Sequence, residues 1–167
     1  HYCRHETRVC GVDAERSVFF DHYVGGDASL AIEQGSRIEG IGRPRVEASF
    51  VPGVLDAMVK VPDVWSLAAM HSLSVRLGQR VGGSTGTNLV AALAFARSMV
   101  ARGESGAIVT LLCDAGERYR HTYFDDAWLA AQDLECGRES DAIDALMDHG
   151  EWPDELRRAW RLAGDLD

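Results

Sequence analysis

The sequence lacks several features that would assign it to a specialised class of protein. No stretch reaches the roughly 18 apolar residues that a membrane-spanning helix needs, and no signal-peptide pattern opens the chain. We therefore expect a cytoplasmic protein with no membrane partner. None of its four cysteines forms a CxxC pair, which argues against a disulfide framework and against a four-cysteine zinc site.

Basic charge is also scarce. The 167 residues contain 17 Lys and Arg against 26 Asp and Glu, which gives a net charge of −9. Residues 1–112 hold 11 acidic and 11 basic side chains, so the acidic excess lies in residues 113–167, with 15 acidic and 6 basic. Because binding to phosphates needs a basic face, we expect no nucleic-acid partner.

The start of the chain leaves one metal-binding alternative open. His1, Cys3, His5 and Cys10 lie close together and are residue types that bind zinc. Their spacing is looser than that of paired zinc ligands, so buried reduced thiols and no metal are the simpler expectation. The first residue is histidine rather than methionine, which predicts a fragment of a longer protein.

Segments with strand and helix patterns alternate along residues 1–137. Residues 7–14 ("TRVCGVDA") indicate a short strand, and the apolar run 106–113 ("GAIVTLLC") indicates a strand buried in a parallel sheet. Between them we expect a helix capped by Asp63 that ends at Gly78, and a second helix from about residue 84 to 103. The pattern predicts an α/β domain with a mostly parallel sheet flanked by helices.

Residues 138–167 differ from the rest of the chain. They are rich in acidic side chains and have the pattern of two short amphipathic helices separated by Pro153. We therefore predict an accessory acidic helical tail, residues 138–167, that packs on the domain formed by residues 1–137 or on a partner subunit.

Three glycine-containing loops are candidates for ligand binding. In parallel α/β sheets, ligands bind beyond the carboxyl ends of the strands, where residues 81–87 ("VGGSTGT") and 113–119 ("CDAGERY") are expected. The third loop, residues 37–45 ("RIEGIGRPR"), contains Gly40 and Gly42, which would allow backbone to approach a bound molecule closely.

The stretch 81–87 is open to three interpretations. Glycines leading into a helix present free N–H groups that could hold a phosphate, but the stretch lacks the P-loop lysine and does not match GxGxxG. It could equally be a capping turn. Residues 82–86 ("GGSTG") also fit GxSxG, so an α/β serine hydrolase with Ser84 as nucleophile is an alternative, although no strong buried strand precedes them.

The polar residues outside these turns favour structural roles. Asp114 is expected to cap the next helix, and Arg118 to pair with a neighbouring carboxylate. The histidines that follow residue 20 have no partner visible in the sequence, so each is expected to be a surface or packing residue.

Together the loops resemble a known family. "RIEGIG", then "VGGSTGTNLVAALAFA", then "LLCDAGERYRHTYFDD", with "VCGVDAERS" upstream, resemble the C-terminal half of the cysteine synthase and cystathionine β-synthase family of pyridoxal-phosphate enzymes. The similarity covers about residues 2–136, and "SRIEGIGRPRVEASFVP" with the acidic tail is most similar to bacterial L-cysteine desulfhydrase-like members. The resemblance implies a fold-type II (tryptophan synthase β-like) enzyme, with pyridoxal 5'-phosphate in a cleft between two α/β domains.

The resemblance also implies a site. It has the Ser84 hydroxyl hydrogen-bonded to the pyridine nitrogen of the cofactor, where a neutral group suits loss of a β-substituent better than formation of a stabilised carbanion. The residues implied are Ser84, Gly83 and Thr85 at the cofactor, Gly40, Ile41, Gly42 and Arg43 in the substrate loop, and Asp114 and Tyr119 as structural neighbours.

Two reactions share this chemistry. L-cysteine would be converted to sulfide, pyruvate and ammonia by a desulfhydrase, whereas a cysteine synthase would add sulfide to an aminoacrylate made from an O-activated serine. The resemblance further implies a homodimer at full length and a place in sulfur amino-acid metabolism.

The departures from the family pattern are informative. In the family, the Schiff-base lysine, an asparagine-containing substrate loop and a glycine- and threonine-rich phosphate cup all lie upstream of the matched region, and none occurs here. Lys60 is the only lysine, at a position where the family has no catalytic group, and we expect it to be solvated. No catalytic residue is therefore expected in this chain, which should be inactive by itself.

Two departures are local. The loop after "EGIG" is lengthened by "RPRVEA", so that Arg43 and Arg45 could reach a substrate carboxylate or hold the loop to acidic neighbours. Cys113 stands where the family usually has a proline before the Asp of its "DSGER" motif.

Overall fold

A computed structural model describes residues 7–164, whose strands form one small sheet. The strands are β1 (Cys10–Ala14), β2 (Ala57–Val61) and β3 (Arg161–Gly164), in the order β1-β2-β3. β1 runs parallel to β2, with Val12 opposite Val59, and β3 runs antiparallel to β2. The predicted α/β class is confirmed, and the sheet is mixed, with one parallel and one antiparallel pair.

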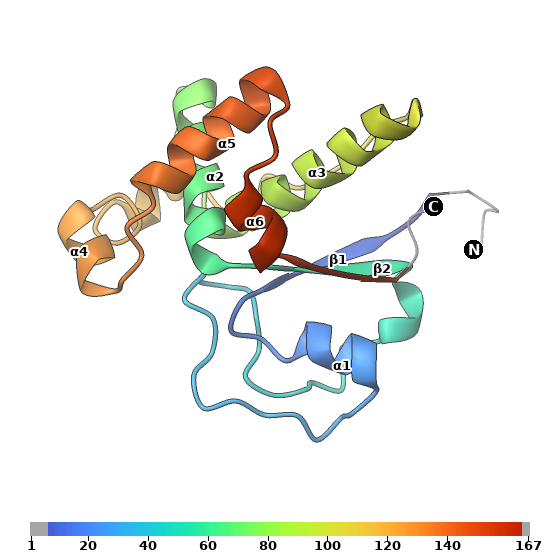
Figure 1. Ribbon diagram of the computed structural model, residues 1–167. Helices are drawn as coiled ribbons and strands as arrows, with labels where there is room; N and C mark the ends of the chain where they lie inside the picture. The colour runs from blue at the N-terminus through green and yellow to red at the C-terminus, as the bar shows by residue number, and fades with distance from the viewer. Residues whose placement is uncertain (1–6, 165–167) are drawn as a thin grey trace.

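Helices cover both faces of this sheet. Figure 1 shows α2, α3, α5 and α6 on one side and α1 on the other, with α4 at the edge of the helical layer. None of the helices within residues 7–164 has the length and apolar content that a bilayer crossing requires. The helices are α1 (Phe19–Gly25), α2 (Asp63–Leu77), α3 (Gly83–Arg102), α4 (Asp126–Ala131), α5 (Gly137–His149) and α6 (Asp154–Ala159), with 3₁₀ turns η1 (Pro52–Val54) and η2 (Gly116–Tyr119).

The two longest helices end where the sequence predicts. Gly78 and Gly103 follow α2 and α3 with φ of 65° and 69°, a left-handed conformation that glycine adopts without steric cost. The expected cap of α2 is wrong, because Pro62 is the N-cap and Asp63 is the first helical residue. The Asp63 carboxylate is fully buried instead, and it accepts a hydrogen bond from Arg37 Nε at 3.0 Å.

α2 and α3 pack closely because glycine stands at their contact. A Cβ on Gly86 would collide with the carbonyl oxygen of Ser66 and lie 2.7 Å from the amide nitrogen of Met70. Only a residue without a side chain lets the two backbones come this close. This contact holds the first turn of α3, which carries the candidate site, against α2 and the core below it.

The run from Gly106 to Cys113 is not the buried strand that its composition predicts. It has no regular secondary structure, and Val109 and Leu111 are 89% and 69% exposed. A strand needs a neighbour to satisfy its backbone N–H and C=O groups and an apolar layer to cover its side chains. Among residues 7–164 no strand pairs with this run, and none pairs with the edge of β1 that faces away from β2.

The chain beyond residue 137 forms the two expected helices and then returns to the sheet. α5 buries Ile143 and Leu146, and it is also tied to α2 through Arg76, which binds Asp144 and Asp148. The prediction of a purely helical tail missed β3, because a strand of four residues carries little periodicity. The boundary at residues 137/138 stays a prediction.

Candidate functional site

The loops 81–87 and 113–119, which lie far apart in the sequence, meet at the first turn of α3. The Gly82 amide donates to the Asp114 carbonyl at 2.9 Å, and the Gly116 amide donates to the Arg80 carbonyl at 2.9 Å. Val81 also forms an antiparallel bridge with Ala115. The expectation that each loop follows the carboxyl end of a strand is wrong, because residues 81–87 connect α2 to α3 and residues 113–119 follow a run without regular secondary structure. The backbone hydrogen bonds between the loops nevertheless bring them to one place.

The three hydroxyls in the first turn of α3 have different environments. The buried Thr85 hydroxyl accepts a hydrogen bond from the Cys113 amide at 3.0 Å, and the buried Thr87 hydroxyl donates to the Gly83 carbonyl at 3.1 Å. Ser84 is half-buried, and within residues 7–164 its hydroxyl makes no hydrogen bond. Ser84 therefore has unused hydrogen-bonding capacity at the start of the helix.

No side chain caps α3. Its N-cap is Gly82, which has no side chain to accept a hydrogen bond, and neither Ser84 nor Thr85 caps the helix. The interpretation of this stretch as a hydroxyl-capped turn is therefore wrong. The Thr85 amide donates to the Gly82 carbonyl at 3.1 Å, whereas the Gly83 and Ser84 amides make no hydrogen bond within residues 7–164. These two amides are available to a ligand, together with the partial positive charge of the helix end.

Aromatic rings pack directly against the two glycines of this turn. A Cβ on Gly82 would lie 3.1 Å from Tyr119 Cε2, and one on Gly83 would lie 3.3 Å from Tyr123 Cε2 and 3.1 Å from Ile38 Cγ2. Any larger residue at either position would push against this packed layer.

The substrate-loop candidate lies against the same turn through Ile38, which is fully buried. Gly40 and Gly42 have φ of 88° and 73°, so both adopt the left-handed conformation that favours glycine. At Gly42 a Cβ would also lie 2.6 Å from Ser36 Cβ, whereas Gly40 faces open space. Residues 40–43 thus form a tight, partly exposed loop beside the start of α3.

The two arginines of the lengthened loop differ in their contacts. Arg45 Nε lies 3.4 Å from Glu47 Oε1, which is the acidic-neighbour role that the sequence left open for it. The Arg43 guanidinium is exposed and donates to the carbonyl of Gly42 at 2.9 Å. Arg43 is the better placed of the two to bind an incoming anion.

Asp114 does not cap η2, whose N-cap is Ala115, so this expectation is wrong. Its carboxylate accepts from the Tyr119 hydroxyl at 2.8 Å and from Arg118 at 3.3 Å. Arg118 also binds Glu39 at 2.9 Å, which confirms its expected pairing with carboxylates. Burial and the hydrogen bond to Asp114 raise the pKa of Tyr119, so the phenol stays protonated and donates.

Lys60 is not the solvated side chain that the sequence predicts. Its side chain is 14% exposed, and Nζ donates to the Ser17 carbonyl and to Asp21 Oδ2, both at 2.7 Å. Burial alone would raise the pKa of Asp21, but hydrogen bonds from Lys60 and Arg161 outweigh it and lower the pKa. The sequence around Lys60, a strand with a valine on each side, does not indicate this ion pair, because the partners of Lys60 come from distant segments.

The hydrolase alternative finds no support in the geometry. A nucleophile elbow needs a strand directly before the serine, and here α2 ends only a few residues upstream. No histidine among residues 7–164 is hydrogen-bonded to Ser84.

The metal alternative cannot be followed at His1, Cys3 and His5, which lie outside the described residues. Within the part of the chain that is described, no group of three or more His, Cys, Asp or Glu side chains could hold a metal ion. Cys10 lies in β1, and its thiol contacts the carbonyl of Gly11.

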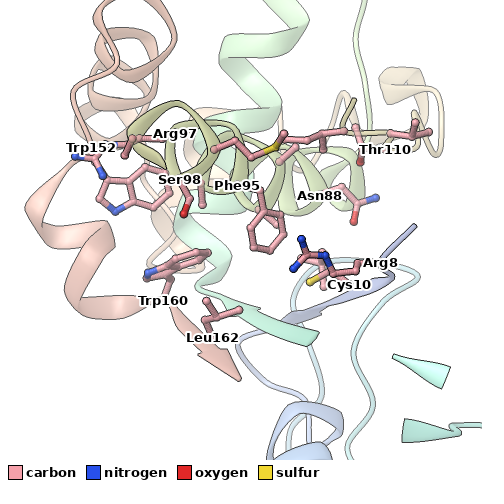
Figure 2. A pocket seen from close by; sticks show the side chains of 18 of the residues that line it. Arg8, Cys10, Asn88, Phe95, Arg97, Ser98, Thr110, Trp152, Trp160 and Leu162 are labelled. Carbon is pink, nitrogen blue, oxygen red and sulfur yellow. The ribbon is translucent and has the colours of Figure 1, made fainter. Parts of the chain in front are cut away.

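A cavity of about 760 Å³ lies away from the loops described so far. It is bounded by the outer face of α3, the edge of β1, the run 106–113 and the two tail tryptophans. In Figure 2, Phe95 points from α3 into this space, with Cys10 of β1 on one side and Trp152 and Trp160 on the other. None of the glycine loops contributes to its lining, so it is a separate groove, lined by apolar side chains with arginines among them.

Comparisons with known proteins give relatives for this chain. No family model matches it. It is 55% identical over 134 residues to "L-cysteine desulfhydrase Cds1" of Mycobacterium tuberculosis, covering 80% of this chain and 36% of that protein. It is 30% identical over 115 residues to "Cysteine synthase 1" of Emericella nidulans, covering 67% of this chain and 30% of that protein.

The fold also has a solved counterpart. The crystal structure of O-ureido-L-serine synthase matches with a TM-score of 0.56 and 26% identity, over 77% of this chain and 40% of that one. The chain thus spans about a third of the length of the curated relatives it matches.

Proposed function

We propose, from the premise that the chain belongs to the cysteine synthase and cystathionine β-synthase family of fold-type II pyridoxal-phosphate enzymes, that it forms part of an enzyme of sulfur amino-acid metabolism. The first candidate reaction is desulfhydration of L-cysteine to sulfide, pyruvate and ammonia. The observation that carries it is the 55% identity to an L-cysteine desulfhydrase over 80% of the chain. Cysteine synthesis from an O-activated serine is the second candidate, supported by the similarity to a cysteine synthase.

The residues at the start of α3 fit one end of pyridoxal 5'-phosphate. The half-buried Ser84 hydroxyl, with no partner among residues 7–164, could donate to the ring nitrogen without giving up an existing hydrogen bond. Gly83 and Thr85, as its buried neighbours, would fix the position of Ser84. When bound, the cofactor supplies a conjugated ring that withdraws electrons from the substrate amino acid.

The substrate would lie beside the loop formed by Gly40, Ile41, Gly42 and Arg43. The exposed Arg43 guanidinium could bind its carboxylate, since Arg pairs well with planar anions. Asp114 and Tyr119 would support this site without touching the substrate, because their hydrogen bond fixes the orientation of the Tyr119 ring that packs on Gly82.

Activity would need a lysine from outside these 167 residues. Lys60 is the only one present, and its ammonium is held by Ser17 and Asp21. The chain alone would therefore bind the cofactor weakly and turn over no substrate.

A homodimer of the complete protein and a cytoplasmic location complete the proposal. The second rests on Cys10, Cys113 and Cys136, which are free thiols, as is usual in a reducing compartment.

The test uses the complete protein loaded with pyridoxal phosphate. Ser84→Ala should lower kcat for sulfide and pyruvate release from L-cysteine by about fivefold, because one neutral hydrogen bond contributes about 1 kcal/mol. Thermal unfolding should change little, and Ser105→Ala, at an exposed loop serine, should match the wild type. Wild-type protein that forms neither sulfide nor, from sulfide and an O-activated serine, cysteine would refute the function. Unchanged turnover in Ser84→Ala would remove only Ser84 from the site.

A further inference from the structure

Two tyrosines form a layer beneath the first turn of α3. Tyr119 and Tyr123 are each 3% exposed, and their rings stack with centroids 4.8 Å apart and an interplanar angle of 23°. Tyr119 contacts the position of Gly82 and Tyr123 contacts that of Gly83. The hydroxyls of this pair point to different partners, and this difference separates their roles.

The Tyr123 hydroxyl is bound to the backbone on both sides of Ile38. It donates to the Arg37 carbonyl at 2.9 Å and accepts from the Glu39 amide at 2.7 Å. Ile38, between them, packs on Gly83. One phenol therefore holds a three-residue segment against the start of α3, immediately before Gly40. The Tyr119 hydroxyl, in contrast, has one hydrogen-bond partner within residues 7–164, the carboxylate of Asp114 in its own loop.

The other end of the Gly40–Arg43 loop is anchored independently. The Arg43 amide donates to Ser17 Oγ at 3.1 Å, and the Arg43 carbonyl accepts from the Val18 amide at 3.0 Å. The loop is thus anchored by hydrogen bonds to Ser17 at one end and to Tyr123 at the other. Of these two anchors, only Tyr123 also touches the turn that carries Ser84.

A second link across the same gap is weak by comparison. The Arg118–Glu39 ion pair joins the two loops at 2.9 Å, but the side chains are 60% and 57% exposed. Solvent-exposed pairs contribute little to stability because water and salt screen them. The hydroxyl of the buried Tyr123 is the stronger tie, because it makes two partly buried hydrogen bonds to the backbone that water screens less than the exposed ion pair.

We propose that Tyr123 is a positioning residue that sets the place of the Gly40–Arg43 loop relative to Ser84, and so the fit of the amino-acid substrate. Its catalytic consequence rests on the proposed function, whereas its hold on the loop does not. Nothing in the reaction requires the phenol itself to touch the substrate.

The first test measures the loop directly, by hydrogen exchange of the chain without cofactor. Tyr123→Phe keeps the stacked ring and removes only the hydroxyl, so the amides from Glu39 to Arg43 should exchange about tenfold faster or more, as loss of the two hydrogen bonds to this segment predicts. The matched control is Tyr119→Phe, which should leave these amides unchanged and speed exchange only in residues 114–119. Equal exchange of residues 39–43 in both variants would overturn the proposal.

The second test measures the substrate fit in the complete protein loaded with pyridoxal phosphate. Tyr123→Phe should raise KM for the amino acid by about tenfold and change kcat by less than about threefold. Tyr119→Phe should leave KM unchanged. A variant that merely lost folded protein would lower kcat at constant KM, and that outcome would refute the positioning role. A wild-type enzyme without activity would refute the proposed function while the exchange result still decided the role of Tyr123.

Discussion

The first turn of α3 and the outer face of the same helix are built in opposite ways. At the first turn, Gly82, Gly83 and Gly86 each stand against a ring or a backbone, and the flanking loops are hydrogen-bonded to it. Along the outer face, apolar side chains line a groove of about 760 Å³, with the exposed run 106–113 on its far wall. One helix therefore has a tightly packed end and an uncovered side.

The difference shows where the polar groups of this chain already have hydrogen-bond partners and where its apolar side chains are still exposed. At the packed end, the groups without a hydrogen-bond partner among residues 7–164 are the Ser84 hydroxyl and the first two amides of α3. The groove instead exposes Val109 and Leu111, and such a contiguous apolar surface associates with other apolar surfaces in water. We therefore expect specific recognition at the packed end and non-specific association at the groove.

The largest effect is expected from disturbing the packed end at Gly86. Gly86→Ala would place a Cβ against the Ser66 carbonyl, and the helices would have to separate, at a cost of about 3 kcal/mol in the free energy of unfolding. Urea denaturation followed by circular dichroism measures this cost. Gly25→Ala, in α1 with nothing within 4 Å of the added Cβ, is the control and should be nearly neutral. Equal midpoints would mean that α2 and α3 are not packed as described.

A smaller effect is expected on self-association when the exposed apolar side chains beside the groove are changed. The chain should self-associate, and Val109→Asp with Leu111→Asp should weaken that association by more than about tenfold, because burying each apolar side chain contributes roughly 1.5 kcal/mol or more. The unfolding midpoint should stay the same, since neither side chain is part of the core. Sedimentation velocity at several concentrations measures the association, and a wild type that stays monomeric throughout would contradict this account of the groove.

The smallest effect concerns the dependence of folding stability on pH, through the partly buried His71. Burial lowers the pKa of His71 in α2, so the folded protein binds this proton less readily than the unfolded chain does. The stability tied to His71 is therefore present above the ordinary histidine pKa and is lost as the pH falls through and below it. Between pH 7.5 and 5.5, the melting temperature of His71→Leu should fall less than that of the wild type. Parallel falls would show that His71 titrates as if exposed.

Features set by neighbouring residues were predicted well. The ends of α2 and α3 at Gly78 and Gly103 follow from glycine in the left-handed conformation, and this is a property of single residues. The strand at Cys10–Ala14 likewise follows from a short local pattern. The family resemblance, read from three glycine loops in order, agrees with the relatives found for the chain.

Features that depend on distant partners were missed. Lys60 was expected in solvent because nothing near it in the sequence indicates Asp21 or the Ser17 carbonyl. Asp63 has the residue type of a helix cap, but Arg37 binds its carboxylate in the interior. Nothing in the sequence indicates the role of Tyr123, since a tyrosine in an aromatic stretch carries no signal that its hydroxyl will hold a backbone segment 84 residues away.

The sequence by itself determined where α2 and α3 end, the glycine-rich turn at the start of α3 and the family to which its loops belong, because glycine conformation and motif order are properties of the sequence itself. Only the tertiary structure decided which buried groups are paired. It also decided that residues 106–113 lie exposed while residues 161–164 join the sheet. A strand is stable only where another strand satisfies its backbone, and that partner is supplied by the fold and not by the strand's own residues.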